Sequence, residues 1–131
     1  MPEFVTLDRL RGLLYDESIP MTHRVLWLIL WQSDLRLGDL LSVDVRDVDW
    51  EARVVPVDFP KTAHDPRHVR ISEQAIDGLR KIVGSRDSGP LFASETGGPL
   101  SREAVTSVAR RAGVSVHGFR LGGQQARADA G

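Results

Sequence analysis

The sequence predicts an α+β fold that is mostly helical, with a small three-stranded antiparallel sheet between groups of helices. Apolar residues recur every three or four positions near both ends of the chain, whereas β-branched and polar residues alternate roughly over residues 43–72. A chain of 131 residues that is 41% hydrophobic suits one globular domain with a single core. We therefore expect a single domain over residues 1–131, ordered as helices, sheet and further helices.

The predicted helices are delimited by residues that typically cap helix ends. Thr6, Ser72 and Ser101 each precede a segment of helical periodicity and can accept a hydrogen bond from its first turn. Pro20 and Thr22 open a helix that is apolar on most sides, so we expect it to lie centrally. The expected helices cover residues 7–15, 22–33, 37–43, 73–83 and 102–113, and a last helix begins in the segment "VHGFRLGG".

The predicted sheet is formed by residues 43–50, 53–59 and 67–72. The first two segments are β-branched and roughly alternating, and Glu51 and Ala52 between them suit a tight connection, which predicts a hairpin. Further along, "GPLFAS" is expected to be a short buried segment and "ETGGP" a turn.

Composition excludes several classes of protein. The absence of cysteine excludes a disulfide framework, a thiolate metal site and a cysteine nucleophile, and it suits a reducing cytoplasm. The longest apolar run, residues 25–31, is far shorter than the roughly 20 residues of a membrane span. The first residues also lack the charged start and apolar stretch of a signal peptide. We expect a cytoplasmic protein with no membrane partner.

Charge is distributed unevenly along the chain. The formal net charge is −1, yet residues 101–131 carry five arginines against two acidic residues, a local balance of +3. This asymmetry suits a surface that faces phosphate groups. Five arginines on solvated helices would give the same pattern, so charge alone leaves both interpretations open.

Four cationic or titratable residues fall at the ends of predicted elements: Arg36, Lys61, His117 and Arg120. Each alone suits an ordinary role, as a helix-end cation, a loop lysine or a packed histidine. Together they are the groups that a phosphoryl-transfer centre without a metal or cofactor needs. Arginines hold the two non-bridging oxygens of a phosphodiester, while lysine and histidine exchange protons with the leaving and attacking oxygens.

The same residues lie in motifs that resemble the catalytic domain of the tyrosine recombinase (phage integrase) family. "SDLRLGDLLSVDVRDVDW" is similar to the family pattern T-G-L-R-x-S-E-L, and "KTAHDPRHVRIS" is similar to its S-K-T-x-x-x-x-R-x-V-P-L-S hairpin. "GPLFASETGGPLSREAVTSVARRAGV" resembles the L-F-x-S…G-x-P-L-S stretch, and "VHGFRLGG" matches H-x-L-R. The motifs occur in the family order from about residue 7 to residue 131.

The resemblance implies a role for each matched residue. Arg36 and Arg120 fall on the two catalytic arginines, Lys61 on the catalytic lysine and His117 on the catalytic histidine, with Asp39 as the supporting acidic residue. Duplex DNA is the implied substrate, cut and rejoined through a 3′-phosphotyrosine, and other recombinase protomers are implied partners.

The sequence also departs from the family pattern. The nucleophilic tyrosine and the G-H or G-W pair before it are not found, and the only tyrosine, Tyr15, lies in the first predicted helix. Leu121 replaces the histidine that often follows the second arginine. We therefore expect a catalytic domain that is incomplete at its C-terminus, lacks an N-terminal core-binding domain and does not cleave DNA by itself, which leaves its status as an enzyme open.

Three hypotheses remain open. The chain is part of a recombinase catalytic domain; or it is a DNA-binding or decoy protein, to which a full-length partner supplies a tyrosine in trans; or it is a structural interaction domain. The last is disfavoured because all three basic positions and the histidine are present.

The stretch "HDPRH" suggests two further kinds of site. His64 and His68 are four apart, which brings metal ligands together on a helix, but this stretch contains a proline and is predicted to be a hairpin turn, so no metal site is expected. Arg67, His68 and Arg70 are instead candidates for contacts to the DNA backbone, as is Arg102 in the arginine-rich segment.

Overall fold

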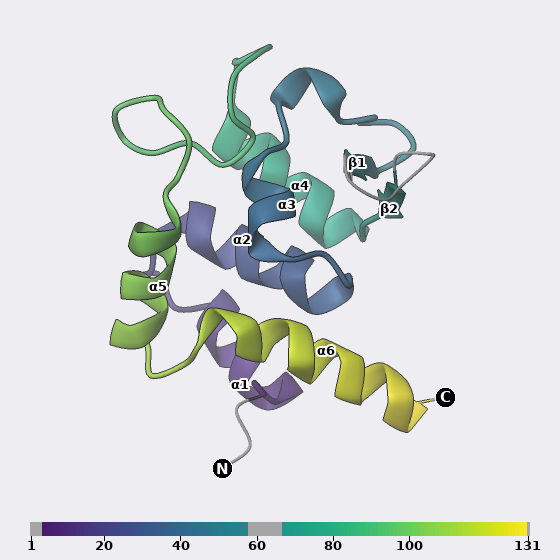
Figure 1. Ribbon diagram of the computed structural model, residues 1–131, viewed down its shortest axis with the longest axis vertical. Coiled ribbons are helices and arrows are strands. Elements are labelled where there is room, and N and C mark those ends of the chain that lie inside the picture. Colours follow the sequence, from purple (N-terminus) through teal and green to yellow (C-terminus); the bar gives the residue numbers. More distant parts are fainter. Residues whose placement is uncertain (1–3, 58–66, 131) are drawn as a thin grey trace.

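The computed structural model describes residues 4–57 and 67–130 (Figure 1). Within these ranges the fold is mostly helical with a small antiparallel sheet, which confirms the predicted fold class. The helices are α1 (Leu7–Leu14), α2 (Met21–Gln32), α3 (Leu37–Leu41), α4 (Glu73–Val83), α5 (Arg102–Arg111) and α6 (Val116–Ala130), with one 3₁₀ turn, η1 (Val45–Asp47), and strands β1 (Val54–Val57) and β2 (Arg67–Arg70).

Three of the predicted caps are confirmed. The hydroxyl of Thr6 accepts a hydrogen bond from the backbone of Arg9, at the start of α1. Ser72 and Ser101 do the same for the first turns of α4 and α5. Each cap satisfies a backbone N–H that has no partner within its helix, which is why these helix starts can be read from the sequence.

Helix α2 occupies the middle of the molecule, with α4 on one side and α6 on the other (Figure 1). Its residues 25–31 are all buried, as expected for a helix that is apolar on most sides. The indole of Trp27 and the side chain of Ile29 are completely buried. Because α2 is buried on several sides, helices α1, α4 and α6 all pack against it.

The sheet has two strands among the described residues, so the strand predicted over residues 43–50, the first of the three, is wrong. β1 and β2 are antiparallel, with Val55 opposite Val69. In residues 43–50 the carboxylate of Asp44 accepts from the backbone N–H of Arg46 at 2.9 Å and starts the turn η1. Val45 and Val48 are both buried. A spacing of three puts both on the same side of a helical turn, whereas in a strand they would face opposite sides.

The predicted tight connection after this segment is present. Asp49 and Val54 exchange backbone hydrogen bonds of 2.9 and 3.0 Å around the turn that contains Glu51 and Ala52. Arg53, in the same turn, has a positive φ of 59°. The turn therefore leads from an isolated bridge, and not from a full strand, into β1.

None of the helices in residues 4–57 and 67–130 is both long and apolar enough to cross a membrane.

Candidate functional site

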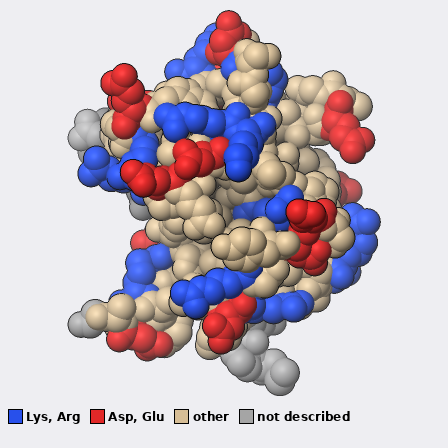
Figure 2. Space-filling view, turned by 180° about the vertical axis from the view of Figure 1, so that it is seen from behind, with Lys and Arg blue, Asp and Glu red and all other residues tan. Residues whose placement is uncertain are grey.

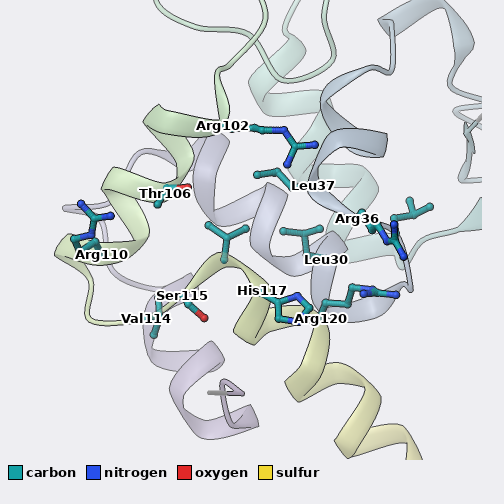
Figure 3. Close-up of a pocket in the computed structure, with 12 residues that line it drawn as sticks. Leu30, Arg36, Leu37, Arg102, Thr106, Arg110, Val114, Ser115, His117 and Arg120 are labelled. Atoms are coloured by element: carbon teal, nitrogen blue, oxygen red, sulfur yellow. The ribbon is translucent and has the colours of Figure 1, made fainter. Parts of the chain in front are cut away.

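A cavity of about 650 Å³ lies where the end of α2, the start of α3, α5 and the start of α6 meet (Figure 3). Three of the predicted catalytic residues line it, Arg36, His117 and Arg120, and so does Arg102. Its other lining residues are Leu30, Leu35, Leu37, Thr106, Arg110, Val114, Ser115 and Val116. The cavity thus combines an apolar floor with a basic rim, and none of its described lining residues is acidic.

Arg36 is placed by the residues around it at the start of α3. Its neighbour Leu35 is completely buried, as is Leu40 within α3. The backbone N–H of Arg36 donates to the carboxylate of Asp39 at 3.0 Å, which ties the residue to the first turn of the helix. The guanidinium stays exposed at the cavity. Asp39 therefore bonds to the backbone that carries Arg36 and not to its guanidinium.

His117 and Arg120 lie three apart in the first turns of α6, so their side chains share one face of the helix. Between them Gly118 and Phe119 are buried on the opposite face, and the carbonyl of Gly118 accepts from the backbone of Val5 at 2.8 Å. Figure 3 shows the side chain of Arg120 extending toward Arg36, with His117 beside it. The buried face thus directs the two polar residues toward the cavity.

The close approach of α6 to α2 depends on two glycines. A Cβ at Gly122 would collide with the carbonyl of Val5 and with the ring of Trp31, and a Cβ at Gly123 would collide with the backbone carbonyl of Trp31. The lack of a side chain at both positions lets the backbone of α6 pack directly against the last turn of α2.

Arg102 extends from the first turn of α5 across the start of α3. Its guanidinium occupies the space that a Cβ of Gly38 would fill. Arg110, about two helical turns further along α5, lines the opposite side of the cavity from Arg36 (Figure 3). The cavity is thereby framed by arginines from three elements, a concentration of positive charge suited to an anion.

Two of the residues predicted to contact the DNA backbone, His68 and Arg70, do not line this cavity. His68 and Arg70 are exposed on β2, where alternate residues share one side of the strand. Arg67 begins β2. Among the described residues of the hairpin none lines the cavity. Lys61 and His64 lie outside the described residues.

Tyr15 does not line the cavity either. It ends α1 and its side chain is 80% exposed. Within residues 4–57 and 67–130 there is no cluster of three histidine or acidic side chains arranged to hold a metal ion. The groups that the cavity offers are therefore guanidinium, imidazole and hydroxyl.

Charge elsewhere on the molecule is less organised. On the face opposite to that of Figure 1, basic and acidic side chains are intermixed (Figure 2). Several surface arginines are paired, for example Arg46 with Asp44 at 3.0 Å and Arg80 with Asp77 at 3.4 Å. The cavity thus differs from this surface in gathering positive charge without a lining acid.

Residues 5–126 match the sequence model of the phage integrase family. The chain belongs to the phage integrase family. The resemblance inferred from its motifs is thereby confirmed at the level of the family. The match also spans the segments that carry Arg36, His117 and Arg120.

A curated relative in this family is the tyrosine recombinase XerC of Azotobacter vinelandii (strain DJ / ATCC BAA-1303). It is 28% identical over 130 residues, which cover 92% of this chain and 43% of the relative. The chain therefore spans less than half the length of this relative.

Solved integrase structures share the fold. The Tn1549 transposon integrase in complex with circular intermediate DNA superposes with a TM-score of 0.81 at 18% identity, over 97% of this chain and 54% of that one. A lambda integrase dimer bound to a COC' core site gives 0.72 at 22% identity, over 92% and 39%. The XerA recombinase gives 0.73 at 20% identity, over 92% and 47%.

Three residues near the cavity of this integrase-family chain were missed by sequence reasoning: Asp34, Gln124 and Arg127. Arg120 Nε donates to the backbone carbonyl of Asp34 at 3.1 Å, and Gln124 and Arg127 donate to its carboxylate at 3.2 and 3.3 Å. The only signal in the sequence was that residues 120, 124 and 127 share one helix face. That spacing does not show that they contact Asp34, which lies 93 residues before Arg127.

Proposed function

We propose that this chain supplies the DNA-phosphate-binding portion of the catalytic domain of a site-specific tyrosine recombinase or integrase. In the complete reaction DNA is cut and rejoined through a 3′-phosphotyrosine. The single observation that carries the proposal is the placement of Arg36, His117 and Arg120 around one cavity, although they come from parts of the chain more than 80 residues apart.

The proposed division of labour follows from the chemistry of the side chains. Arg36 and Arg120 hold the two non-bridging oxygens of the scissile phosphate and stabilise the charge that builds up on them. His117 exchanges a proton with the attacking or bridging oxygen. Lys61 is proposed to protonate the leaving 5′-oxygen, on the resemblance alone, because it lies outside the described residues. The mechanism needs no metal or cofactor.

Duplex DNA is the proposed substrate, and other recombinase protomers are proposed partners. The related Tn1549 and lambda integrases were solved with DNA, the latter as a dimer on a core site and as a tetramer on a Holliday junction. Arg102 is proposed to contact the DNA backbone beside the cavity, and Arg67, His68 and Arg70 to contact it from the hairpin. A cytoplasmic location accords with the absence of cysteine.

The covalent step requires a tyrosine from outside these 131 residues. Tyr15 is the only tyrosine, and it is exposed at the end of α1, away from the cavity lining. This observation favours DNA binding without strand cleavage by the chain alone, with a tyrosine supplied by another segment or protomer. Incubation with a nicked duplex should therefore give no protein-linked DNA; a covalent product at Tyr15 would refute this part of the proposal.

DNA binding by the cavity is tested with a fluorescein-labelled duplex and fluorescence anisotropy. Arg36→Ala and Arg120→Ala should each weaken binding about tenfold or more, the size expected for a charge-assisted contact to phosphate. Each should also reduce the slope of log K against log salt by about 0.9. Lys81→Ala is the matched control, because it removes the same charge from an exposed position on α4, on the other side of α2 from α6 (Figure 1). An equal loss in all three variants would overturn the proposal.

A further inference from the structure

Asp34, in the turn between α2 and α3, accepts hydrogen bonds from three side chains of α6. Its backbone carbonyl accepts from Nε of Arg120 at 3.1 Å. One oxygen of its carboxylate, Oδ1, accepts from the side-chain amide of Gln124 at 3.2 Å and from Arg127 at 3.3 Å. The donors are four and three residues apart, so they form one row along the helix face that meets this turn.

The same row continues onto the last turn of α2. Arg127 also donates to the carbonyl of Trp31 at 2.7 Å, which places a cation at the negative C-terminal end of α2. On the inner side of the turn, the hydroxyl of Ser33 donates to Ile29 at 2.7 Å and accepts from the backbone of Leu35 at 3.3 Å. The turn is therefore held from both sides, by α2 itself and by α6.

This turn joins the two predicted catalytic arginines of the cavity. Arg36 follows Asp34 by two residues, across the buried Leu35, while Arg120 is held through the Asp34 carbonyl. In the described part of the chain no hydrogen bond engages the two terminal nitrogens of Arg120. With Nε held, the guanidinium presents its terminal edge, whose two nitrogens can donate to two oxygens of a phosphate at once.

We propose that Asp34 is a positioning residue for the phosphate site, and that its carboxylate holds the α2–α3 turn against α6 so that Arg120 faces the same phosphate as Arg36. The inference rests on the proposed function, because it assigns Asp34 a task within that site. Asp34 touches neither the DNA nor the reacting atoms in this role; it acts through Arg120.

Two effects of Asp34 on DNA binding have opposite signs. A carboxylate beside a phosphate-binding surface repels DNA, so loss of its charge by itself strengthens binding. Loss of the hydrogen bonds releases the turn and Arg120, which weakens binding. Asp34→Asn removes the charge and keeps an oxygen that accepts from Gln124 and Arg127, whereas Asp34→Ala removes both. The two variants have the same net charge, so the difference between them isolates positioning.

The test is the affinity of Asp34→Asn and Asp34→Ala for the same fluorescein-labelled duplex. We expect Asp34→Asn to bind at least as tightly as the unmodified chain, and Asp34→Ala to bind about two- to fivefold more weakly than Asp34→Asn, the effect of breaking a pair of exposed polar contacts. Thermal unfolding of both variants checks that they fold; the Asp34 side chain is 55% exposed, so its replacement leaves the core intact.

Two further comparisons separate positioning from a general loss of stability. In an Arg120→Ala background the difference between Asp34→Asn and Asp34→Ala should vanish, because the residue through which Asp34 acts is gone. Gln124→Ala should weaken DNA binding, whereas Gln125→Ala should not. Gln125 is the same residue type one position along the helix, and it donates instead to Asp129 at 3.0 Å.

Equal affinities of Asp34→Asn and Asp34→Ala, or a difference that persists without Arg120, would overturn the inference about Asp34. That result is distinguishable from failure of the proposed function. If the site binds DNA but Asp34 does not position it, Arg36→Ala and Arg120→Ala still weaken binding more than Lys81→Ala. If the site does not bind DNA, those variants behave like the Lys81 control.

Discussion

The indole ring of Trp27 is stacked on the phenyl ring of Phe119, with centroids 4.9 Å apart and planes inclined by 16°. Both side chains are completely buried. Trp27 belongs to the central helix α2, and Phe119 lies in α6 directly before Arg120. The contact therefore fixes the part of α6 that carries His117 and Arg120 to the most buried helix of the molecule.

Truncation of this contact should destabilise the whole fold. Phe119→Ala removes a fully buried ring, and we expect the free energy of unfolding to fall by about 3–5 kcal/mol. Urea unfolding followed by circular dichroism measures the change. Phe119→Leu, which retains apolar bulk but loses the stacked ring, should cost clearly less. A loss below about 1 kcal/mol for the alanine variant would mean that the ring is not part of a tightly packed core.

The glycine pair of α6 should not tolerate even one methyl group. In Gly122→Ala the new Cβ meets the backbone carbonyl of Val5 and the ring of Trp31. Neither is the free end of a flexible side chain, so α6 must move away from α2, and we expect a loss of about 2 kcal/mol or more in unfolding free energy. Urea unfolding gives the magnitude, and reduced DNA affinity should accompany it because Arg120 moves with the helix.

Gly12→Ala is the matched control for this variant. Gly12 is also within a helix, α1, but a Cβ there has no atom within 4 Å. Alanine is the better helix former, so this change should raise the unfolding free energy by about 0.5–1 kcal/mol. If both glycine variants shifted stability in the same direction, close packing of α6 on α2 would not be the reason for the effect at Gly122.

The helix starts and the buried helix were predicted correctly because both features depend on residues that are close together in the sequence. Thr6, Ser72 and Ser101 cap helices through bonds to residues three positions away, so the starts of α1, α4 and α5 could be read directly. The same holds for the buried run of α2, since periodicity is a local property. The strand predicted over residues 43–50 is wrong because alternating valines do not exclude a turn. Asp44 caps the 3₁₀ turn η1, which takes the place of the strand.

The candidate site was predicted as a set of residues but not as a geometry. Its motifs supplied Arg36, His117 and Arg120 from family order. The contacts beside Arg120 join Asp34 to residues 86 to 93 positions away, and no spacing rule predicts a contact across such a separation. Gly38 also could not be assigned a role from the sequence. Its lack of a side chain matters only because the guanidinium of Arg102, from α5, occupies the space beside it.

Stability should fall as the solution becomes mildly acidic, because of one buried histidine. His23 is only 6% exposed, and burial, with a smaller effect of Arg111, lowers the pKa of its imidazole below 6.5. Below pH 6.5 the unfolded chain takes up a proton that the folded chain resists. The contribution of neutral His23 to the free energy of unfolding is therefore fully present above pH 6.5, and it is lost as the pH falls through the pKa of His23 in the folded state.

The measurement is urea unfolding at several pH values between about 7.5 and 5, above the ordinary carboxylate pKa values of about 4. The unmodified chain should lose stability over this interval. His23→Leu should show a flatter dependence. An unchanged slope in His23→Leu would assign the acid sensitivity to another group.

Gly38→Ala should separate DNA binding from stability. The Cβ would take the place of the Arg102 guanidinium, which is the end of a flexible side chain and can swing aside at little cost. Alanine is favoured within α3, so we expect the unfolding free energy to stay within about 1 kcal/mol of the unmodified chain. The affinity for duplex DNA should nevertheless fall about as far as in Arg102→Ala, because the displaced guanidinium no longer lies beside the cavity.

The double variant, Gly38→Ala with Arg102→Ala, should bind DNA no more weakly than either single variant. If Arg102→Ala weakened binding while Gly38→Ala did not, the position of Arg102 over α3 would not be the one that contacts phosphate.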